Sequence, residues 1–207
     1  MRVKGILSPI VQCCGGRLMD KESQKLLLKL ARESILENLT ASPSPTLEFL
    51  DKNRPKDLIG KEGAFVTLRK KGLDSSDQRS LRGCIGNVIG KRPLYRTVYR
   101  LAKESAFGDV RFSGVTIDEM DNIEIEVSVL TPLQVVDSYS DIVVGQDGVL
   151  LTSGVHRSLF LPQVAVEQNW DLETMLTNLS LKAGLNPNGW ENPDCRFEVF
   201  QATIFGE

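Results

Sequence analysis

Segments with the spacing of amphipathic helices alternate along this chain with segments of strand character, and this order constrains the fold most strongly. Apolar residues recur at three- and four-residue steps over residues 20–39 and line one side of residues 93–106, and a last helix is predicted over 171–183. The strict apolar and polar alternation of residues 123–130 predicts a strand with one exposed face. The order favours a mixed α+β fold with mainly antiparallel sheets over a doubly wound fold.

Hairpins account for most of the remaining strand segments. Branched and aromatic residues predict strands over 63–69 and 81–89, which should pair as a hairpin with a long loop. Two short strands over 149–151 and 158–161 flank a turn, and a strand over 196–204 ends the chain.

Prolines mark the clearest internal boundary of the chain. Residues 42–45 read Ser-Pro-Ser-Pro, and a further proline follows in Arg54-Pro55. Because proline lacks a backbone donor, these positions can continue neither a helix nor a central strand. We therefore expect an extended loop here, with a short apolar turn over 47–50.

The composition is that of an ordinary globular protein. The chain has 207 residues, of which 41% are hydrophobic and 25% charged, enough for one substantial core or two small ones. Its net charge of -2 does not favour bulk attraction to nucleic acid, and no segment approaches the roughly 20 apolar residues of a membrane span. Residues 1–16 are expected to form a tail or docking segment.

The cysteines and the single histidine predict neither a disulfide framework nor a metal site. Cys13, Cys14, Cys84 and Cys195 lack paired metal-ligand spacing, and His156 is the only histidine. We therefore expect a cytoplasmic, reduced protein that carries no metal or other cofactor.

The hexapeptide at residues 81–86, Leu-Arg-Gly-Cys-Ile-Gly, is the strongest candidate for a functional site. Gly83 and Gly86 would let another group approach the backbone, and the cation of Arg82 would lower the pKa of the Cys84 thiol. The same residues also suit a tight strand end in which a small apolar cysteine fills a gap. Both interpretations stay open at this point.

A stripe of cations on the predicted helix over 93–106 is the best basic surface. Its members recur at four-, four- and three-residue steps, beside two tyrosines: Arg92, Arg96, Arg100 and Lys103, with Tyr95 and Tyr99. Such a stripe is typical of a solvated helix face, which is the interpretation we favour. The alternative is an anion or nucleic-acid contact with stacking tyrosines.

Two other sets of titratable residues can be considered for catalysis. His156 could serve as a base for Cys84, although its surroundings favour an exposed turn residue. Glu124 and Glu126 share a strand face and could act as paired carboxylates, but glutamates facing water explain the alternation equally well.

Five short motifs together resemble the AMMECR domain family, whose microbial members are called AmmeMemoRadiSam system protein A. They are residues 81–86, 127–132, 161–165 and 182–185, together with Trp190. Residues 109–114 depart from the family's Asp-Pro-Arg-Phe-x-Pro pattern at Val110 and Gly114, while Asp109 and Arg111 are kept.

The resemblance implies an α+β domain of two lobes over 17–207, with a larger lobe built from both chain ends and a smaller one from an internal segment beginning near 40. It also implies association with a Memo-like protein and a radical S-adenosylmethionine protein. We expect a small-ligand or catalytic site around Cys84, the candidate nucleophile; the ligand residues would be Arg82, Gly83, Gly86, Asp109, Arg111 and Gln163. The alternative is a non-catalytic adaptor that binds a partner protein, with nucleic acid as a weaker possibility.

Overall fold

Two four-stranded antiparallel sheets organise the chain in a computed structural model that describes residues 19–73 and 77–207. Sheet A has the strand order β2-β1-β3-β8, and sheet B has the order β4-β7-β5-β6. The mixed, antiparallel α+β class predicted from the sequence is confirmed. The expected tail at 1–16, with Cys13 and Cys14, lies outside the described residues.

Sheet A contains the predicted hairpin. Its strands are β1 (Glu62–Lys70), β2 (Leu81–Ile89), β3 (Ile123–Leu130) and β8 (Ala202–Gly206). β2 is an edge strand that pairs with β1, and Thr67 lies opposite Cys84 in the register. β1 pairs on its other side with β3, where Thr67 lies opposite Glu126.

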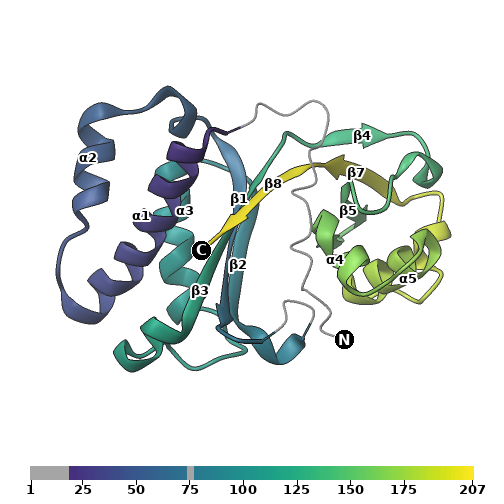
Figure 1. Cartoon of the computed structure of the whole chain (residues 1–207). Coiled ribbons are helices and arrows are strands. Elements are labelled where there is room, and N and C mark those ends of the chain that lie inside the picture. Colours follow the sequence, from purple (N-terminus) through teal and green to yellow (C-terminus); the bar gives the residue numbers. More distant parts are fainter. Residues whose placement is uncertain (1–18, 74–76) are drawn as a thin grey trace, which may run out of the picture.

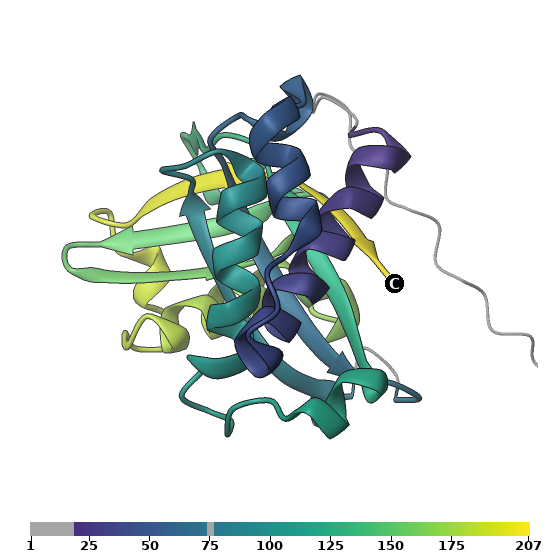
Figure 2. The ribbon, with the colours of Figure 1, turned by 90° about the vertical axis from the view of Figure 1, so that its left-hand side faces the viewer.

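Three helices cover one face of sheet A (Figures 1 and 2). They are α1 (Lys21–Thr40), α2 (Pro45–Asn53) and α3 (Leu94–Phe107). The predicted first helix is confirmed, and its cap is the Asp20 side chain, which accepts from the Ser23 N–H. Apolar side chains from the helices and the sheet form one core that includes the fully buried Leu27, Val66 and Leu101.

Residues 45–53 form a helix, so the predicted extended loop is wrong there. Ser44 accepts a hydrogen bond from the Leu47 N–H, and Pro45 occupies the first turn of α2. Pro45, a predicted helix breaker, thus begins a helix, because the first turn needs no donor from proline. α2 buries Leu50 in the core shared with α1 and α3, and residues 41–44 separate two helices of one unit.

The second unit is built around sheet B. Its strands are β4 (Gln134–Val136), β5 (Gly148–Ser153), β6 (His156–Phe160) and β7 (Arg196–Phe200), and its helices are α4 (Pro162–Glu167) and α5 (Leu172–Lys182). Leu151, Leu176 and Trp190 belong to its separate core. Short 3-10 turns complete the two units: η1 (Lys56–Leu58), η2 (Gln78–Ser80), η3 (Ile117–Asn122), η4 (Tyr139–Asp141) and η5 (Gly189–Glu191). No described helix has the length and apolar character needed to cross a bilayer.

Every strand of sheet B lies within residues 134–200. Residues 45–130 share the core of α1 and sheet A, because β1 and β3 pair directly and α2 and α3 cover the same sheet face. The C-terminal strand β8 returns to sheet A beside β3. The first unit is therefore built from both ends of the described chain.

The strand expected over 196–204 is two strands in different sheets. β7 belongs to sheet B and β8 to sheet A, with Gln201 between them. At this point the Thr131 N–H donates to the Gln201 carbonyl at 2.9 Å, and the Gln201 N–H donates to the Thr131 hydroxyl at 2.8 Å. The uninterrupted strand pattern does not reveal this change of sheet, because its cause is pairing with distant segments.

α3 lies unusually close to the hairpin. A Cβ atom at Gly83 would be 2.1 Å from the Ser105 carbonyl oxygen, so only glycine admits the helix here. The Ser105 hydroxyl donates to the Val66 carbonyl at 2.8 Å and accepts from the Ile85 N–H at 2.9 Å. One buried side chain thereby links α3 to both strands of the hairpin.

Replacing Ser105 with alanine should destabilise the protein by about 1–3 kcal/mol, because a buried donor and a buried acceptor would lose their partner. Urea unfolding monitored by circular dichroism measures this change. Ser42→Ala removes an exposed hydroxyl and should change the free energy of unfolding by less than about 0.5 kcal/mol. Equal effects of the two substitutions would contradict the bridging role of Ser105.

Candidate functional site

Cys84, Thr67 and Glu126 form a row across three neighbouring strands, which we call the Cys84 row. They are register partners on β2, β1 and β3, so their side chains share one face of sheet A. The adjacent Val66 and Val127 pack in the helical core, and the row therefore lies on the opposite face, toward the second unit. The Cys84 Sγ and Thr67 Oγ1 atoms are 3.3 Å apart and hydrogen bonded.

An aspartate and an arginine close the outer edge of this row. The Cys84 N–H, at the open edge of β2, donates to Asp109 Oδ2 at 2.9 Å. Arg111 donates to the same carboxylate through Nε at 2.9 Å and Nη2 at 2.6 Å, and its Nη2 lies 3.4 Å from the Cys84 carbonyl oxygen. These donors lower the pKa of Asp109 to about 2. The structure thus brings together three of the predicted site residues.

Arg82 points to a different partner from the one predicted. The register between β1 and β2 shifts at Leu68 and Arg69, which leaves Arg82 as the extra residue of a bulge. Its side chain is buried and donates to Glu119 at 2.8 and 3.0 Å and to the Ser113 carbonyl at 2.9 Å. Arg82 lowers the pKa of Glu119 to about 2 and makes no hydrogen bond to Cys84. The cation beside the thiol is Arg111.

The spaces beside the two glycines of the hexapeptide are filled by the protein itself. The Ser105 carbonyl of α3 occupies the position next to Gly83. A Cβ atom at Gly86 would lie 2.1 Å from the Phe65 ring. Close packing therefore explains both glycines, whereas the sequence had suggested that they admit a ligand.

The pKa of Cys84 moves in the opposite direction from the one expected. Burial of the half-buried thiol raises its pKa, and the hydrogen bond from Thr67 and the charge of Arg111 offset this only in part. The ordinary thiol pKa already lies above neutrality. Cys84 is therefore a neutral thiol at neutral pH.

Glu126 does not face water as the alternation suggested. It is half-buried in the Cys84 row, and burial raises its pKa, while the charge of Arg69 lowers it. Glu124, two residues earlier on the same strand face, is exposed. Only Glu126 contributes a carboxyl group to the site.

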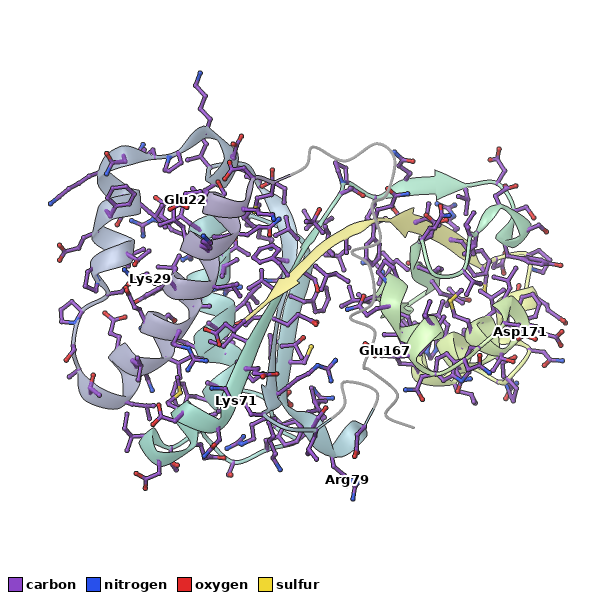
Figure 3. The ribbon with its side chains drawn as sticks, in the orientation of Figure 1. Glu22, Lys29, Lys71, Arg79, Glu167 and Asp171 are labelled. Atoms are coloured by element: carbon purple, nitrogen blue, oxygen red, sulfur yellow. The ribbon has the colours of Figure 1, made fainter. Side chains whose placement is uncertain are left out.

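The second unit contacts sheet A through α4 and contributes a cation, Lys182, that interacts electrostatically with Cys84. Arg69 Nη2 of β1 lies 4.0 Å from Glu167 Oε1 of α4, and Figure 3 places Glu167 on the side of its unit that faces sheet A. Lys182, at the end of α5, donates to the Leu159 carbonyl at 2.9 Å. Partial desolvation lowers the pKa of Lys182; the nearby Arg111 charge lowers it further, and the Cys84 thiolate would raise it.

Sequence reasoning missed Thr67 and Lys182 as members of the site. Thr67 lies in an ordinary strand pattern, and only the register shows that it contacts Cys84. Lys182 begins one of the five motifs, residues 182–185, and this motif is the one sequence feature that could have indicated its membership of the site. Within the described chain, no group of three or more His, Cys, Asp or Glu side chains is arranged to hold a metal ion.

Two predicted participants form no hydrogen bond to the Cys84 row among the described residues. His156 begins β6, where its Nδ1 is 2.9 Å from the Ala183 carbonyl oxygen. Gln163 lies in the first turn of α4, and its Oε1 is buried without a hydrogen-bond partner among the described residues. Neither side chain forms a hydrogen bond with Cys84 or Thr67 in the described part of the chain.

Carboxylates pair with most of the cationic stripe on α3. Arg96 bonds to Asp51 at 2.7 Å, Lys103 to Glu37 at 2.8 Å, and Arg100 to Glu104 at 3.4 Å; Arg92 is exposed just before the helix. The pairs join α3 to α1 and α2 and neutralise most of the stripe. This arrangement favours the interpretation as a charged helix face over a nucleic-acid surface.

Comparison with known proteins gives consistent results. The AMMECR1 family model matches residues 28–205. Protein PYRAB00100 of Pyrococcus abyssi is 39% identical over 88% of this chain and 89% of its own length, and a protein of Methanothermobacter thermautotrophicus is 40% identical over 91% and 96%. The crystal structure of uncharacterized protein PH0010 from Pyrococcus horikoshii has a TM-score of 0.81 at 38% identity, covering 91% of this chain and 93% of that one.

Acid should loosen the connector between α3 and β3. Asp109 and Glu119 have pKa values of about 2, below their ordinary values, so their ion pairs stabilise the fold above about pH 4. This contribution is lost as the pH falls from about 4 toward 2. Urea unfolding between pH 5 and 2.5 should show a smaller loss of stability in Asp109→Asn and Glu119→Gln than in the wild type. If the wild type and both variants lost the same amount of stability over this pH range, the assignment of the acid sensitivity to these two ion pairs would be contradicted.

Cys84 should alkylate as a thiol of raised pKa. The rate of its reaction with iodoacetamide, followed by mass spectrometry of the folded protein, should still be rising above pH 9, because only the thiolate reacts. Thr67→Val removes the hydrogen bond that lowers the pKa of Cys84, so it should shift the pH dependence of the alkylation rate to higher pH. A plateau below pH 8 would contradict a neutral thiol.

Proposed function

The chain belongs to the AMMECR1 family, and the names of the relatives given above state no activity. From the geometry of the site, we propose that the Cys84 row binds a small anionic molecule. The ligand would lie against the face of sheet A that is turned toward α4 and α5. Arg111 and Lys182 would hold its anionic group, and Cys84 and Thr67 would contact it as neutral polar groups. The observation that carries the proposal is the Arg111 guanidinium, whose Nη2 lies 3.4 Å from the Cys84 carbonyl oxygen, together with the electrostatic interaction of Lys182, from the other unit, with Arg111 and Cys84.

Arg111 is held ready for an anion. Its pairing with Asp109 uses Nε and Nη2, while Nη1 has no hydrogen-bond partner among the described residues. The side chain is 53% exposed, whereas the Asp109 side chain is only 4% exposed. A guanidinium that is fixed on one edge and open on the other presents its remaining donors with little loss of conformational freedom.

Lys182 adds a second donor from the opposite unit. Its ammonium group is fixed by the Leu159 carbonyl and lies 4.6 Å from the centroid of the Phe160 ring. Desolvation, and to a smaller extent repulsion from Arg111, lowers the pKa of Lys182, and an anion bound between the two cations would relieve the repulsion. Clusters of perturbed titratable groups are typical of functional sites.

The protonation state of the row supports ligand binding more than nucleophilic attack. The raised pKa of Cys84 keeps the thiol neutral, so a nucleophile would need a base to remove its proton. Burial raises the pKa of Glu126 as well, which makes this carboxyl group a weaker repeller of anions. A catalytic role for Cys84 is the second candidate, favoured by the Thr67 hydrogen bond and the Arg111 charge that act to lower the thiol pKa.

The setting of the protein is also proposed. A reducing, cytoplasmic location is supported by Cys84 and Cys195, which are both free thiols. Partnership with a Memo-like protein and a radical S-adenosylmethionine protein follows only from the family resemblance. A purely adaptor function would leave the Cys84 row without a ligand.

The charge of the alkylating reagent tests the site directly. Iodoacetate is a small anion and iodoacetamide is its neutral counterpart, so we expect the iodoacetate to iodoacetamide rate ratio to be higher at Cys84 than at Cys195. The variants Arg111→Gln and Lys182→Gln should each lower the ratio at Cys84 about tenfold, the effect of losing roughly 1.4 kcal/mol of a charge-assisted contact. Mass spectrometry of the labelled peptides reads both cysteines in one sample.

A matched variant controls for net charge. Lys21→Gln and Lys25→Gln remove exposed cations of α1 and should leave the ratio unchanged. Thermal unfolding checks that Arg111→Gln remains folded. Lys182→Gln tests the site without disturbing the ion pair between Arg111 and Asp109. Equal ratios at Cys84 and Cys195 in the wild type would refute an anion site at the Cys84 row.

A further inference from the structure

Five exposed cations lie at the end of the first unit where β2 ends and α3 begins. They belong to two segments of the chain, residues 54–61 and 89–92, and are Arg54, Lys56, Lys61, Lys91 and Arg92. Residues 54–62 and 89–92 together hold these five cations and two carboxylates, whereas the whole chain has a net charge of -2. Such a local excess of positive charge indicates contact with an anionic surface.

The two segments lie side by side. The Leu94 N–H, at the start of α3, donates to the Gly60 carbonyl at 2.8 Å. Glu62, at the start of β1, is the register partner of Ile89, at the end of β2. Gly90 packs so closely here that a Cβ atom would lie 2.2 Å from the Glu62 carbonyl oxygen. The cations of both segments therefore share one end of the unit.

The protein itself does not neutralise these five side chains. In the described part of the chain, no ion pair or side-chain hydrogen bond joins any of them to another residue, whereas most cations of α3 are paired with carboxylates. The two carboxylates of the segments, Asp57 and Glu62, are half-buried, and each has one oxygen that is shielded from solvent. Positive charge consequently dominates the exposed part of this surface.

Two isoleucines are exposed among the cations. Ile59 and Ile89 are 41% and 66% exposed, and neither packs in the core of the first unit. Ile59 lies between Lys56 and Lys61 in the chain, and Ile89 precedes Lys91 by two residues. Binding to a bilayer surface increases with the apolar area that is buried and with attraction to anionic lipid. Surfaces that bind single-stranded nucleic acid use aromatic side chains to stack on bases, so the isoleucines favour a bilayer.

We propose that this end of the first unit binds the surface of an anionic lipid bilayer. The five cations would lie against the lipid phosphates, and Ile59 and Ile89 would enter the boundary between headgroups and acyl chains. Contact of this kind needs no membrane-spanning helix. The Cys84 row takes no part in it, so the bilayer contact and the anion site proposed above are independent of each other.

Sedimentation with lipid vesicles tests the proposal. Vesicles of phosphatidylcholine with about 30% phosphatidylglycerol should bind the full chain at low ionic strength, with half-saturation below about 1 mM lipid. Pure phosphatidylcholine vesicles should bind at least about tenfold more weakly, and about 0.5 M salt should release the protein from the anionic vesicles. No binding to the anionic vesicles up to about 5 mM lipid would overturn the proposal.

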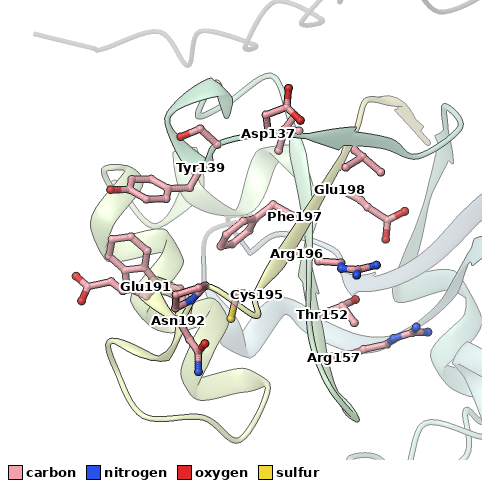
Figure 4. A pocket seen from close by; sticks show the side chains of 15 residues that line it. Asp137, Tyr139, Thr152, Arg157, Glu191, Asn192, Cys195, Arg196, Phe197 and Glu198 are labelled. Carbon is pink, nitrogen blue, oxygen red and sulfur yellow. The ribbon is translucent and has the colours of Figure 1, made fainter.

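Two double variants of equal charge test the cations. Lys91→Gln with Arg92→Gln should weaken binding to the anionic vesicles at least about tenfold, because each cation near the bilayer adds to the attraction. Arg157→Gln with Arg196→Gln removes two exposed cations of the second unit (Figure 4) and should leave binding unchanged. Equal losses in the two variants would show that net charge alone drives adsorption and would overturn the assigned surface.

The isoleucines distinguish a bilayer from another polyanion. Ile59→Thr with Ile89→Thr should weaken binding to the anionic vesicles at least about fivefold, because less apolar area would be buried. Val110→Thr with Val155→Thr changes two exposed valines outside these segments and should have no effect. Thermal unfolding checks that all variants are folded. Full binding by the isoleucine variant, or tighter binding to a DNA duplex than to the vesicles, would overturn the proposal.

Discussion

Two hydrogen bonds between Thr131 and Gln201 determine how the two halves of this molecule meet. Thr131 follows β3, where the chain leaves sheet A, and Gln201 precedes β8, where the chain returns to it. The two crossing segments are therefore held to each other, and the second unit is confined to the side of sheet A that the helices leave uncovered (Figure 1). The electrostatic interaction between Lys182 and Cys84 depends on this placement.

Within this arrangement, the hexapeptide has a structural part and a functional part. Arg82 fixes the connector through Glu119, Gly83 admits α3, and Gly86 accommodates the Phe65 ring. These contacts account for three of the six residues without any ligand. Cys84 differs from them because its thiol lies on the face that both units approach, with Thr67 as its partner.

The position of Cys84 between the two units also explains why its thiol is not activated in the way that catalytic cysteines are. Activated cysteines have depressed pKa values, commonly from an adjacent cation or a helix N-terminus. Here burial outweighs the Arg111 charge, since Arg111 already neutralises Asp109. The cation is consequently placed to attract an anion toward a neutral thiol more than to ionise it.

Much of the fold could be predicted from the sequence, because local signals coincide with tertiary structure. The Asp20 cap, the 81–89 strand and the α3 pattern all reflect interactions within a few residues, and the structure confirms them. Pro45 misled because proline at the first turn begins a helix as readily as proline elsewhere ends one.

The candidate site was only half predictable. Cys84, Asp109 and Arg111 were found, but strand register and a bulge decide which residues surround them, and both depend on pairing between distant segments. The expected closeness of Arg82 to the thiol assumed a regular strand, in which residues two apart share a face. The bulge removed that relation, and Thr67 and Lys182 came from elements that no local pattern links to Cys84.

The most direct test of an anion site at the Cys84 row is crystallography with a selenium-labelled anion. Crystals grown with millimolar selenate, and measured at the selenium absorption edge, would locate the anion independently of any assay. We predict an anomalous peak within hydrogen-bonding distance of both Arg111 and Lys182, which disappears when Lys182→Gln is crystallised under the same conditions. Selenate bound only elsewhere on the molecule, with this position empty, would contradict the proposal.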